Sequence, residues 1–288
     1  MRRCLAVIAL FAGCSSPPKG PPDDAALSRL GHAGTIAFNL EQPTQAVEQY
    51  RAALARAHTR DDAGAIADAG FNLATAQLRA GQPQAALDTA RQIQAELARR
   101  GITDPAFDLI AATALFRLDD LAASDATAAR LAASGDPAMA NPAWFMRGLI
   151  ADIHADRPGL ERAAGSLTKT ADAADSAELQ ARLSHDPSPA LHAADLRRTA
   201  LDYRGMARCL ALAAQYTPDP EAAADLYLRA GRSAAARGET AEARIWLTAA
   251  RDHAADAGLR QDADEGLQHL AHPSGLARNA NPEPESGR

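Results

Sequence analysis

The spacing of helix-breaking residues is the feature that most constrains the fold of this chain. Alanine is the commonest residue, aromatic residues make up 4% of the chain, and no segment shows sustained period-2 alternation of β-branched residues, so helices are favoured over strands. Each breaker sits between two amphipathic runs of helical length. The chain is therefore predicted to form a series of helical hairpins, with turns or helix boundaries at Gln42-Pro43, Gln82-Pro83, Asp119-Asp120, Asp156 to Gly159, Pro218 to Pro220 and Gly238-Glu239.

Sequence stretches around these turns resemble one another. FNLEQPTQAVEQYRAAL at 38–54 matches QLRAGQPQAALDTARQI at 77–93 turn for turn, and the stretches at 114–131 and 235–250 repeat the pattern. This pattern resembles the tetratricopeptide repeat (TPR), a 34-residue helix-turn-helix unit. The resemblance implies an all-α, right-handed solenoid of TPR-like helical hairpins over 25–271. The residues that carry it best are Tyr227, Ala230, Gly231, Ala234, Gly238, Ala243, Leu247 and Ala250.

The sizes of the residues in each hairpin suggest how its two helices pack. Small residues at Gly34 and Ala46 allow the helices to approach closely, and the larger Tyr50 then fills the space between neighbouring hairpins. From Ala46 to the equivalent Ala86 is 40 positions and not 34. This spacing predicts an insertion in the first two hairpins, around HTRDDAG at 58–64.

The region of about 160–190 is predicted to be irregular, because the repeat pattern breaks down there. Asp175 with Glu178 three residues later is the signature of a capping box and predicts the start of a short helix. Ser188-Pro189 predicts the start of a long helix that continues to about Tyr216. Near the end of the array, the residues after 258 are predicted to form a terminal helix that closes the last hairpin.

The first 13 residues have the order of an export signal. Arg2 and Arg3 precede an apolar run at 5–13, which is shorter than the ~20 residues of a membrane-spanning helix. The stretch LFAGC at 10–14 resembles the lipobox of bacterial lipoproteins, where the cysteine takes a diacylglycerol and the signal is cut before it. This resemblance implies lipidation at Cys14; the alternative is a chance Gly-Cys pair in an ordinary secretory signal.

The two segments that flank the predicted solenoid favour extended or disordered chain. Residues 14–24 are rich in Pro, Gly and Ser and predict a tether, and residues 272–288 predict a disordered tail. By the lipoprotein resemblance, Ser15 and Ser16 after the cysteine favour anchoring to the outer membrane, facing the periplasm. Acyl chains on one residue would hold the protein to the membrane without spanning it.

Patterns typical of catalytic or metal sites are weak in this chain. Ser166 and Lys169 fit the S-x-x-K spacing of penicillin-binding proteins and β-lactamases, but the companion S-D-N and K-T-G elements are absent. His269 and His272 lack the spacing and carboxylate partner of a metal site. Cys209 lies in an apolar helical run, which predicts a buried, inert thiol. We therefore expect no enzyme activity, no metal and no other cofactor.

The candidate binding surface is the groove of the solenoid. The net charge is -6 and no basic block is present, which argues against nucleic acid as a partner. Solenoids usually bind a peptide or a partner helix on the concave side, lined by the first helix of each hairpin. Arginines on that side would bind acidic groups or a C-terminal carboxylate of the partner. The alternative is that they simply form the solvent-exposed face of the helices. The candidate groove residues are Phe71, Asn72, Thr75, Arg79, Phe116, Arg117, Phe145, Arg147, Arg229 and Arg232.

Together these features predict a lipid-anchored TPR adaptor or scaffold in the bacterial envelope. Its partners would be other envelope proteins, in secretion, pilus biogenesis or envelope assembly. An alternative is a periplasmic module that binds a peptide or a peptidoglycan fragment in the groove. The least favoured hypothesis is a serine hydrolase that uses Ser166 and Lys169.

Overall fold

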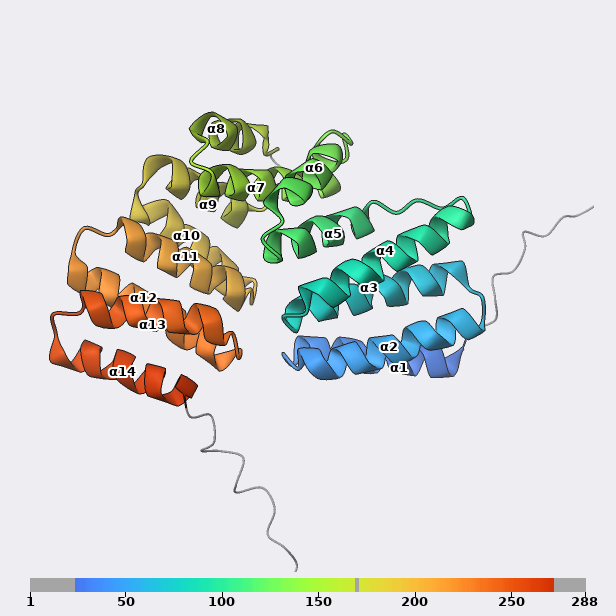
Figure 1. Cartoon of the computed structure of the whole chain (residues 1–288), viewed down its shortest axis with the longest axis horizontal. Coiled ribbons are helices and arrows are strands. Elements are labelled where there is room, and N and C mark those ends of the chain that lie inside the picture. Colours follow the sequence, from blue (N-terminus) through green and yellow to red (C-terminus); the bar gives the residue numbers. More distant parts are fainter. Residues whose placement is uncertain (1–23, 169–170, 272–288) are drawn as a thin grey trace, which may run out of the picture.

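The computed structural model describes residues 24–168 and 171–271, and in this part of the chain almost every residue outside the short turns is helical (Figure 1). No strand occurs among these residues, and none of their helices is long and apolar enough to cross a membrane. The helices are α1 (Ala25–Asn39), α2 (Pro43–Thr59), α3 (Ala63–Arg79), α4 (Pro83–Arg99), α5 (Ala106–Arg117), α6 (Leu121–Ala132), α7 (Pro137–Ile153), α8 (Arg157–Ser166), α9 (Ala173–Ser184), α10 (Pro187–Thr199), α11 (Tyr203–Tyr216), α12 (Pro220–Ala236), α13 (Thr240–His253) and α14 (Ala257–Ala271).

The helices form one continuous stack in chain order. Every helix packs against the next one, and some also pack against the next but one, as α3 does with α5 and α12 with α14. This is how repeat solenoids are built, because each hairpin buries its apolar face only against its neighbours. The predicted all-α solenoid of TPR-like helical hairpins is therefore confirmed, and α14 closes the last hairpin as predicted.

Six hairpins share one kind of turn. One residue adopts a left-handed backbone conformation, and the residue directly after it precedes the second helix. In three of these turns the second residue is an aspartate whose carboxylate accepts a hydrogen bond from the first turn of the helix, which stabilises its start. The left-handed residues are Glu41, Gly81, Asp119, Ala155, Leu201 and Gly238.

Close approach of the two helices in a hairpin depends on glycine. A Cβ atom on Gly34 would lie 2.6 Å from Cε1 of Tyr50, and one on Gly231 would lie 2.7 Å from Cγ of Leu247. Tyr50 also clusters with the buried Leu73 of the next hairpin. The predicted pairing of small and large residues is thus confirmed in both hairpins.

The extra residues predicted around 58–64 lie in helices and not in a loop. Helices α2 and α3 are 17 residues each, and the turn between them at 60–62 is as short as the other turns. The 40-residue spacing therefore comes from longer helices and not from an inserted loop. Longer helices keep the backbone hydrogen-bonded internally, which an inserted loop would not do.

Helix α9 is the element that makes the region of 160–190 irregular. It is an additional helix between the hairpins α7–α8 and α10–α11, and it packs against all four of these helices. Its N-cap is Asp172, whose carboxylate accepts from the backbone N–H of Ala174, so the predicted capping box at Asp175 and Glu178 is wrong. The Glu178 side chain is instead fully buried and accepts hydrogen bonds from arginines.

The predicted long helix from Ser188-Pro189 to Tyr216 is also wrong, because the chain turns back at Leu201. Leu201 has a φ of 58° and the carboxylate of Asp202 caps α11 by accepting from the backbone N–H of Gly205. An aspartate that bonds the backbone in this way competes with continuation of a helix. The result is two helices, α10 and α11, that form a hairpin of their own.

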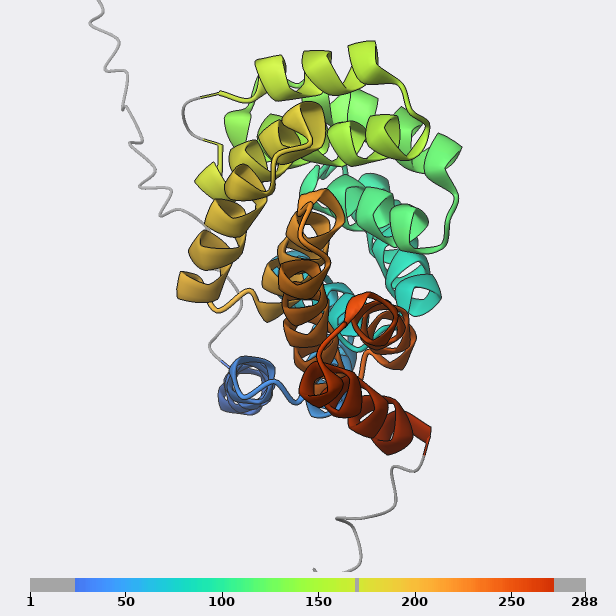
Figure 2. The same ribbon diagram turned by 90° about the vertical axis from the view of Figure 1, so that its left-hand side faces the viewer.

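The stack bends into two arms. We call α1–α5 the N-terminal arm, α10–α14 the C-terminal arm, and α6–α9 the bend; in Figure 1 the arms lie on the right and left below the bend. The bend remains at the top when the molecule is viewed from the side of the C-terminal arm (Figure 2). None of the closely packed helix pairs joins one arm to the other. The ends of the arms therefore face each other across a gap.

The predicted signal, Cys14 and nearly all of the predicted tether lie outside the described residues, as does the predicted tail at 272–288. Asp24, the last residue of the predicted tether, is the N-cap of α1 and also pairs with Arg56 and Arg60 of α2 at 2.7 and 3.1 Å. The backbone N–H of Leu27 is the main cause that lowers the pKa of Asp24 to about 2, with burial opposing it and Arg56 adding to it.

Candidate functional site

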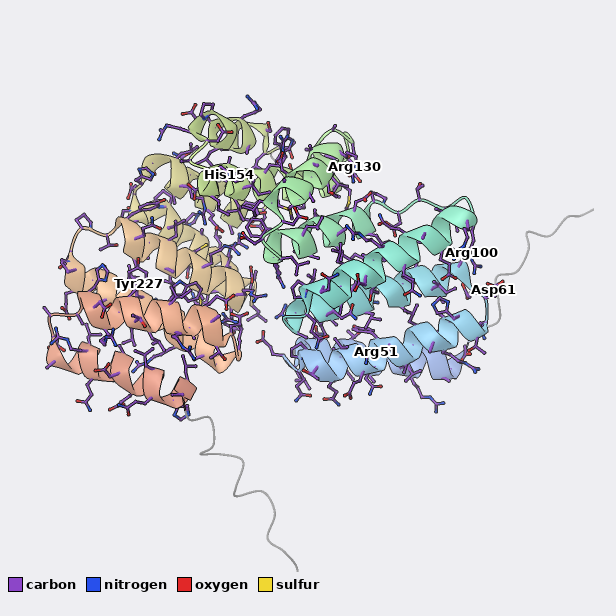
Figure 3. All side chains as sticks on the ribbon, viewed as in Figure 1. Arg51, Asp61, Arg100, Arg130, His154 and Tyr227 are labelled. Atoms are coloured by element: carbon purple, nitrogen blue, oxygen red, sulfur yellow. The ribbon has the colours of Figure 1, made fainter. Side chains whose placement is uncertain are left out.

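A cavity of about 340 Å³ lies where the two arms face each other. The N-terminal arm contributes the ends of α1, α3 and α5, and the C-terminal arm contributes the turns that begin α11 and α13. The opposite edge of the N-terminal arm, with Asp61 and Arg100, lies far from this gap (Figure 3). The residues that line the cavity are Phe38, Glu41, Pro43, Thr75, Leu78, Arg79, Arg117, Asp202, Arg204, Ala236, Arg237 and Glu239.

The hairpin stacking explains why these residues meet. In the N-terminal arm, α1, α3 and α5 are the first helices of successive hairpins, so their carboxyl ends lie side by side. In the C-terminal arm, the turns after α10 and α12 bring Asp202 and Glu239 to the corresponding edge. The cavity is therefore lined by the same type of hairpin turn from both arms.

Three of the four arginines in the cavity are paired with carboxylates of their own arm. Arg79 lies 2.9 Å from Glu41 and stacks over the ring of Phe38, whose centroid is 5.0 Å from the guanidinium carbon. Glu239 accepts from two arginines of the C-terminal arm. These are Arg204 at 2.7 Å and Arg237 at 2.6 Å.

Arg117 differs from these three arginines. Its guanidinium donates to the backbone carbonyl of Leu78, and in the described part of the chain it makes no ion pair with a carboxylate. Desolvation by the surrounding protein and the nearby charge of Arg204 lower the pKa of Arg117 to about 10, although Glu239 partly offsets this. Arg117 remains protonated at neutral pH, so the cavity holds a cation suited to an anionic partner.

Three of the ten predicted groove residues, Thr75, Arg79 and Arg117, line this cavity. Phe71 lies on the same helix as Thr75 and packs edge-on against Phe107 at 6.2 Å between ring centroids. Asn72 is half-buried on α3, and Phe116 packs in the core between α5 and the bend.

The remaining four groove residues lie elsewhere and have partners of their own. Phe145 lies under the guanidinium groups of two arginines near α9, and Arg147 is 2.8 Å from Asp125. Arg229 and Arg232 are exposed on α12, paired with carboxylates at 3.6 and 3.0 Å. The structure thus gathers part of the predicted set, and the role of all ten in binding stays a prediction.

Arg204, Arg237 and Glu239 line the cavity although no sequence pattern marks them as site residues. The signal that would have placed Arg204 is the pair Leu201-Asp202, an apolar residue before an aspartate, which here forms the same turn as Asp119-Asp120. Without glycine or proline it was interpreted as helix interior. No local signal places the C-terminal arm opposite Arg117, because that juxtaposition depends on the bend.

A buried charge cluster holds α9 in the bend. Glu178 has no exposed side-chain surface and accepts from Arg182, Arg197 and Arg208 at 2.8 to 3.1 Å. Burial disfavours its ionisation, but the charges and hydrogen bonds of these arginines outweigh burial and hold the pKa of Glu178 well below its usual range. The neighbouring Cys209 is buried as predicted, and burial with the Glu178 charge raises the pKa of its thiol to about 12.

The residues of the weak catalytic and metal-site patterns lie partly outside the described residues. Ser166 donates its hydroxyl to the backbone carbonyl of Arg162 at 2.7 Å, while Lys169 is not described, so the S-x-x-K hypothesis stays a prediction. His269 lies near the end of α14 and His272 is not described. Among the described residues, no group of three or more His, Cys, Asp or Glu side chains is arranged to hold a metal ion.

Among known proteins, this chain is similar to solved helical-repeat structures, with low sequence identity. No family model and no curated protein matches the chain. A tetratricopeptide repeat protein from Parabacteroides merdae is 16% identical over 86% of this chain and 100% of that chain, with a TM-score of 0.48. The TPR2AB domain of yeast Sti1 in its pHSP90 complex is 14% identical over 85% of this chain and 98% of that chain, with a TM-score of 0.33. BtubC (BKLC) from P. vanneervenii is 15% identical over 92% of this chain and 97% of that chain, with a TM-score of 0.31. The assignment of this chain to the all-α solenoids of TPR-like hairpins rests on its own helix pairs and turns.

Proposed function

We propose that this protein is a lipid-anchored adaptor that holds another protein of the bacterial envelope by an acidic segment bound in the cavity between the arms. The observation that carries the proposal is Arg117, a cation in a cavity with three further arginines and with no carboxylate partner among the described residues. A guanidinium group pairs with a carboxylate through two parallel hydrogen bonds, which gives both affinity and orientation. A non-enzymatic role fits this arrangement.

The size and lining of the cavity suit a short segment of a partner and not a folded domain. A volume of about 340 Å³ is at the lower end of the range for small-ligand sites. Phe38, Pro43 and Leu78 supply apolar surface beside the arginines. A peptide with one or two carboxylates next to an apolar residue would therefore contact both parts of the lining.

The test of the adaptor role is partner capture from cells treated with a crosslinker. Wild-type protein and an Arg117→Met variant are compared with Arg198→Met, which removes an exposed arginine of α10 outside both the cavity and the predicted groove residues. We expect one envelope protein to be recovered with wild type and R198M and to be lost with R117M. Equal recovery with R117M would contradict a role of the cavity, and recovery of no protein would contradict the adaptor.

Thermal melting of the same purified protein distinguishes the adaptor from the alternative, a module that binds a small ligand. Thermal stabilisation by peptidoglycan fragments, with no protein partner recovered, would favour the module that binds such fragments. Melting temperatures of wild type and R117M with and without muropeptides give this comparison directly. If the adaptor proposal is correct, muropeptides leave both melting temperatures unchanged.

Anchoring is supported by the order of charged, apolar and small residues that ends at Cys14. We expect wild-type protein to be labelled by a radioactive fatty acid and to sediment with membranes, and the variant Cys14→Ser to lose both properties. A Cys4→Ser variant is the matched control, because Cys4 lies inside the predicted signal. Persistent labelling of C14S would show that the lipobox hypothesis is wrong, and separation of inner and outer membranes tests the location.

A further inference from the structure

The position of one arm relative to the other is not set by packing between them. Closely packed helix pairs follow the chain around the bend, and none of them joins α1–α5 to α10–α14. Interfaces that bury little apolar surface leave relative motion as the default. What lies in the cavity therefore contributes to how far apart the arms stay.

Each side of the cavity carries arginines together with carboxylates, Glu41 on one side and Asp202 and Glu239 on the other. Arg117 projects from the end of α5 in the N-terminal arm, and Arg204 lies at the start of α11 in the C-terminal arm. Both arginines line the same cavity, and the charge of Arg204 lowers the pKa of Arg117. The carboxylates of Glu239 and Glu242 offset part of this repulsion, but both are already within pairing distance of Arg204.

We propose that a pair of carboxylates on an acidic peptide binds between Arg117 and Arg204 and thereby holds the two arms together. An anion that touches both arginines makes its full set of contacts only when the arms are close. Such a ligand binds the closed arrangement more tightly and shifts the population toward it. This inference rests on the proposed function, because the peptide would belong to the partner, and it adds that binding changes the shape of the adaptor.

The chemistry of the lining favours carboxylates as the bridging groups. Glu41 and Glu239 of this chain already occupy guanidinium edges of the cavity at 2.6 to 2.9 Å. A carboxylate of the ligand would add to this network with the same geometry, and Arg117 offers the edge that no carboxylate of the described chain occupies. A peptide with adjacent glutamates can present one carboxylate to each arm.

The experiment measures the distance between the arms in the full chain. Spin labels are attached at Arg51→Cys on α2 and Arg244→Cys on α13, two exposed positions on opposite arms, with Cys4 and Cys14 replaced by serine. Cys209 is buried and stays in place. Double electron–electron resonance then gives the distance distribution with no ligand, with N-acetyl-tetraglutamate, with N-acetyl-tetraglutamine and with inorganic phosphate.

We expect tetraglutamate to narrow the distribution toward the short distance, and tetraglutamine and phosphate to leave it unchanged. In Arg117→Met and in Arg204→Met, the concentration of tetraglutamate that gives half of the narrowing should rise about tenfold, because each variant lacks one charge-assisted pair. Arg198→Met, an exposed position outside the cavity, should behave as wild type. Two cavity variants are used so that poor folding of one, detected by circular dichroism, does not decide the result.

Several outcomes would overturn this inference. Equal narrowing by tetraglutamine, or unchanged midpoints in both cavity variants, would place the effect outside the arginine pair. Narrowing by phosphate alone would show a general anion site and not one for paired carboxylates. If calorimetry shows that tetraglutamate binds but the distance between the arms does not change, coupling of the arms is refuted and the proposed adaptor role is not. If tetraglutamate closes the arms and R117M weakens this closure, but no partner is captured from cells, only the adaptor role is refuted.

Discussion

The hairpins of the N-terminal arm and the helix α9 in the bend differ in their buried contacts. In α1–α4 the interior is mainly alanine, glycine and large apolar side chains such as Ile66, Ile93 and Leu97, all buried. On α9 the apolar Leu179 is also fully buried, but beside it lies the buried carboxylate of Glu178, surrounded by three arginines from α9, α10 and α11. The same all-α stack therefore relies on hydrophobic packing in one region and adds paired buried charges to it in the other.

This difference shows how a repeat can accept an extra helix. Apolar contacts between neighbouring hairpins depend on size and tolerate many partners. A buried carboxylate is stable only when its specific donors are in place, so Glu178 ties α9 to α10 and α11, and Arg182 links it further to Asp152 of α7. The charge cluster thus links the bend to the first two helices of the C-terminal arm.

The largest expected effect comes from breaking the charge cluster. Glu178→Gln leaves three arginines around an uncharged group, and loss of one member of a buried ion pair costs about 3 to 5 kcal/mol of unfolding free energy. Glu161→Gln, which removes an exposed pair with Arg157, is the control and should cost less than about 0.5 kcal/mol. Urea denaturation followed by circular dichroism checks both, and equal values for the two variants would contradict the comparison.

The stability difference between wild type and Glu178→Gln should depend on pH. The folded-state pKa of Glu178 lies below its ordinary value of 4.5, so the stabilisation by its ionised form is complete above that pH and is lost as the pH falls toward the folded-state pKa. We expect the difference in unfolding free energy to be constant from pH 8 to about 5.5 and to shrink below 4.5. A difference that grows in acid would have the wrong sign for this account.

A smaller effect is expected from the apolar hairpins. Gly231→Ala places a methyl group 2.7 Å from Leu247 Cγ and 3.1 Å from its backbone nitrogen, and such overpacking costs about 1 to 3 kcal/mol. Gly31→Ala on α1 meets no atom within 4 Å and should raise stability by about 0.5 to 1 kcal/mol, because alanine favours helix. Thermal melts of the two variants should shift in opposite directions; a shared direction would argue against close helix packing at Gly231.

The smallest effect concerns the turn that the sequence analysis missed. Leu201 is 63% exposed and has a left-handed backbone, whereas the equivalent residues in two other hairpins are glycines. Leu201→Gly should therefore increase the unfolding free energy by about 1 kcal/mol, and Gly238→Ala should lower it by a similar amount. Chemical denaturation of the two variants checks this pair. A loss of stability in L201G would mean that the leucine side chain makes contacts that matter more than backbone strain.

Much of the regular array is predictable from residues close in sequence. Gly34 and Tyr50 belong to one hairpin, and the pairs Asp119-Asp120 and Gly238-Glu239 mark their own turns, so spacing alone locates them. The turn at Leu201 escaped because leucine carries no turn signal and only its exposure in the folded chain makes it tolerable there. The spacing of Asp175 and Glu178 predicts a capping box, because the arginine partners of Glu178 at 197 and 208 are too distant in sequence to recognise by pattern.

The sequence by itself determined the helical fold class, most of the hairpin turns and the small residues at helix contacts, because these depend on backbone propensity and on side chains a few turns apart. It also indicated that the first helices of the hairpins carry arginines. Only the tertiary structure decided that Arg117 faces Arg204, since their distance depends on every packing angle between α5 and α11. Small changes in each angle add up along a solenoid, so residues close in sequence do not reveal which side chains of the two arms line one cavity.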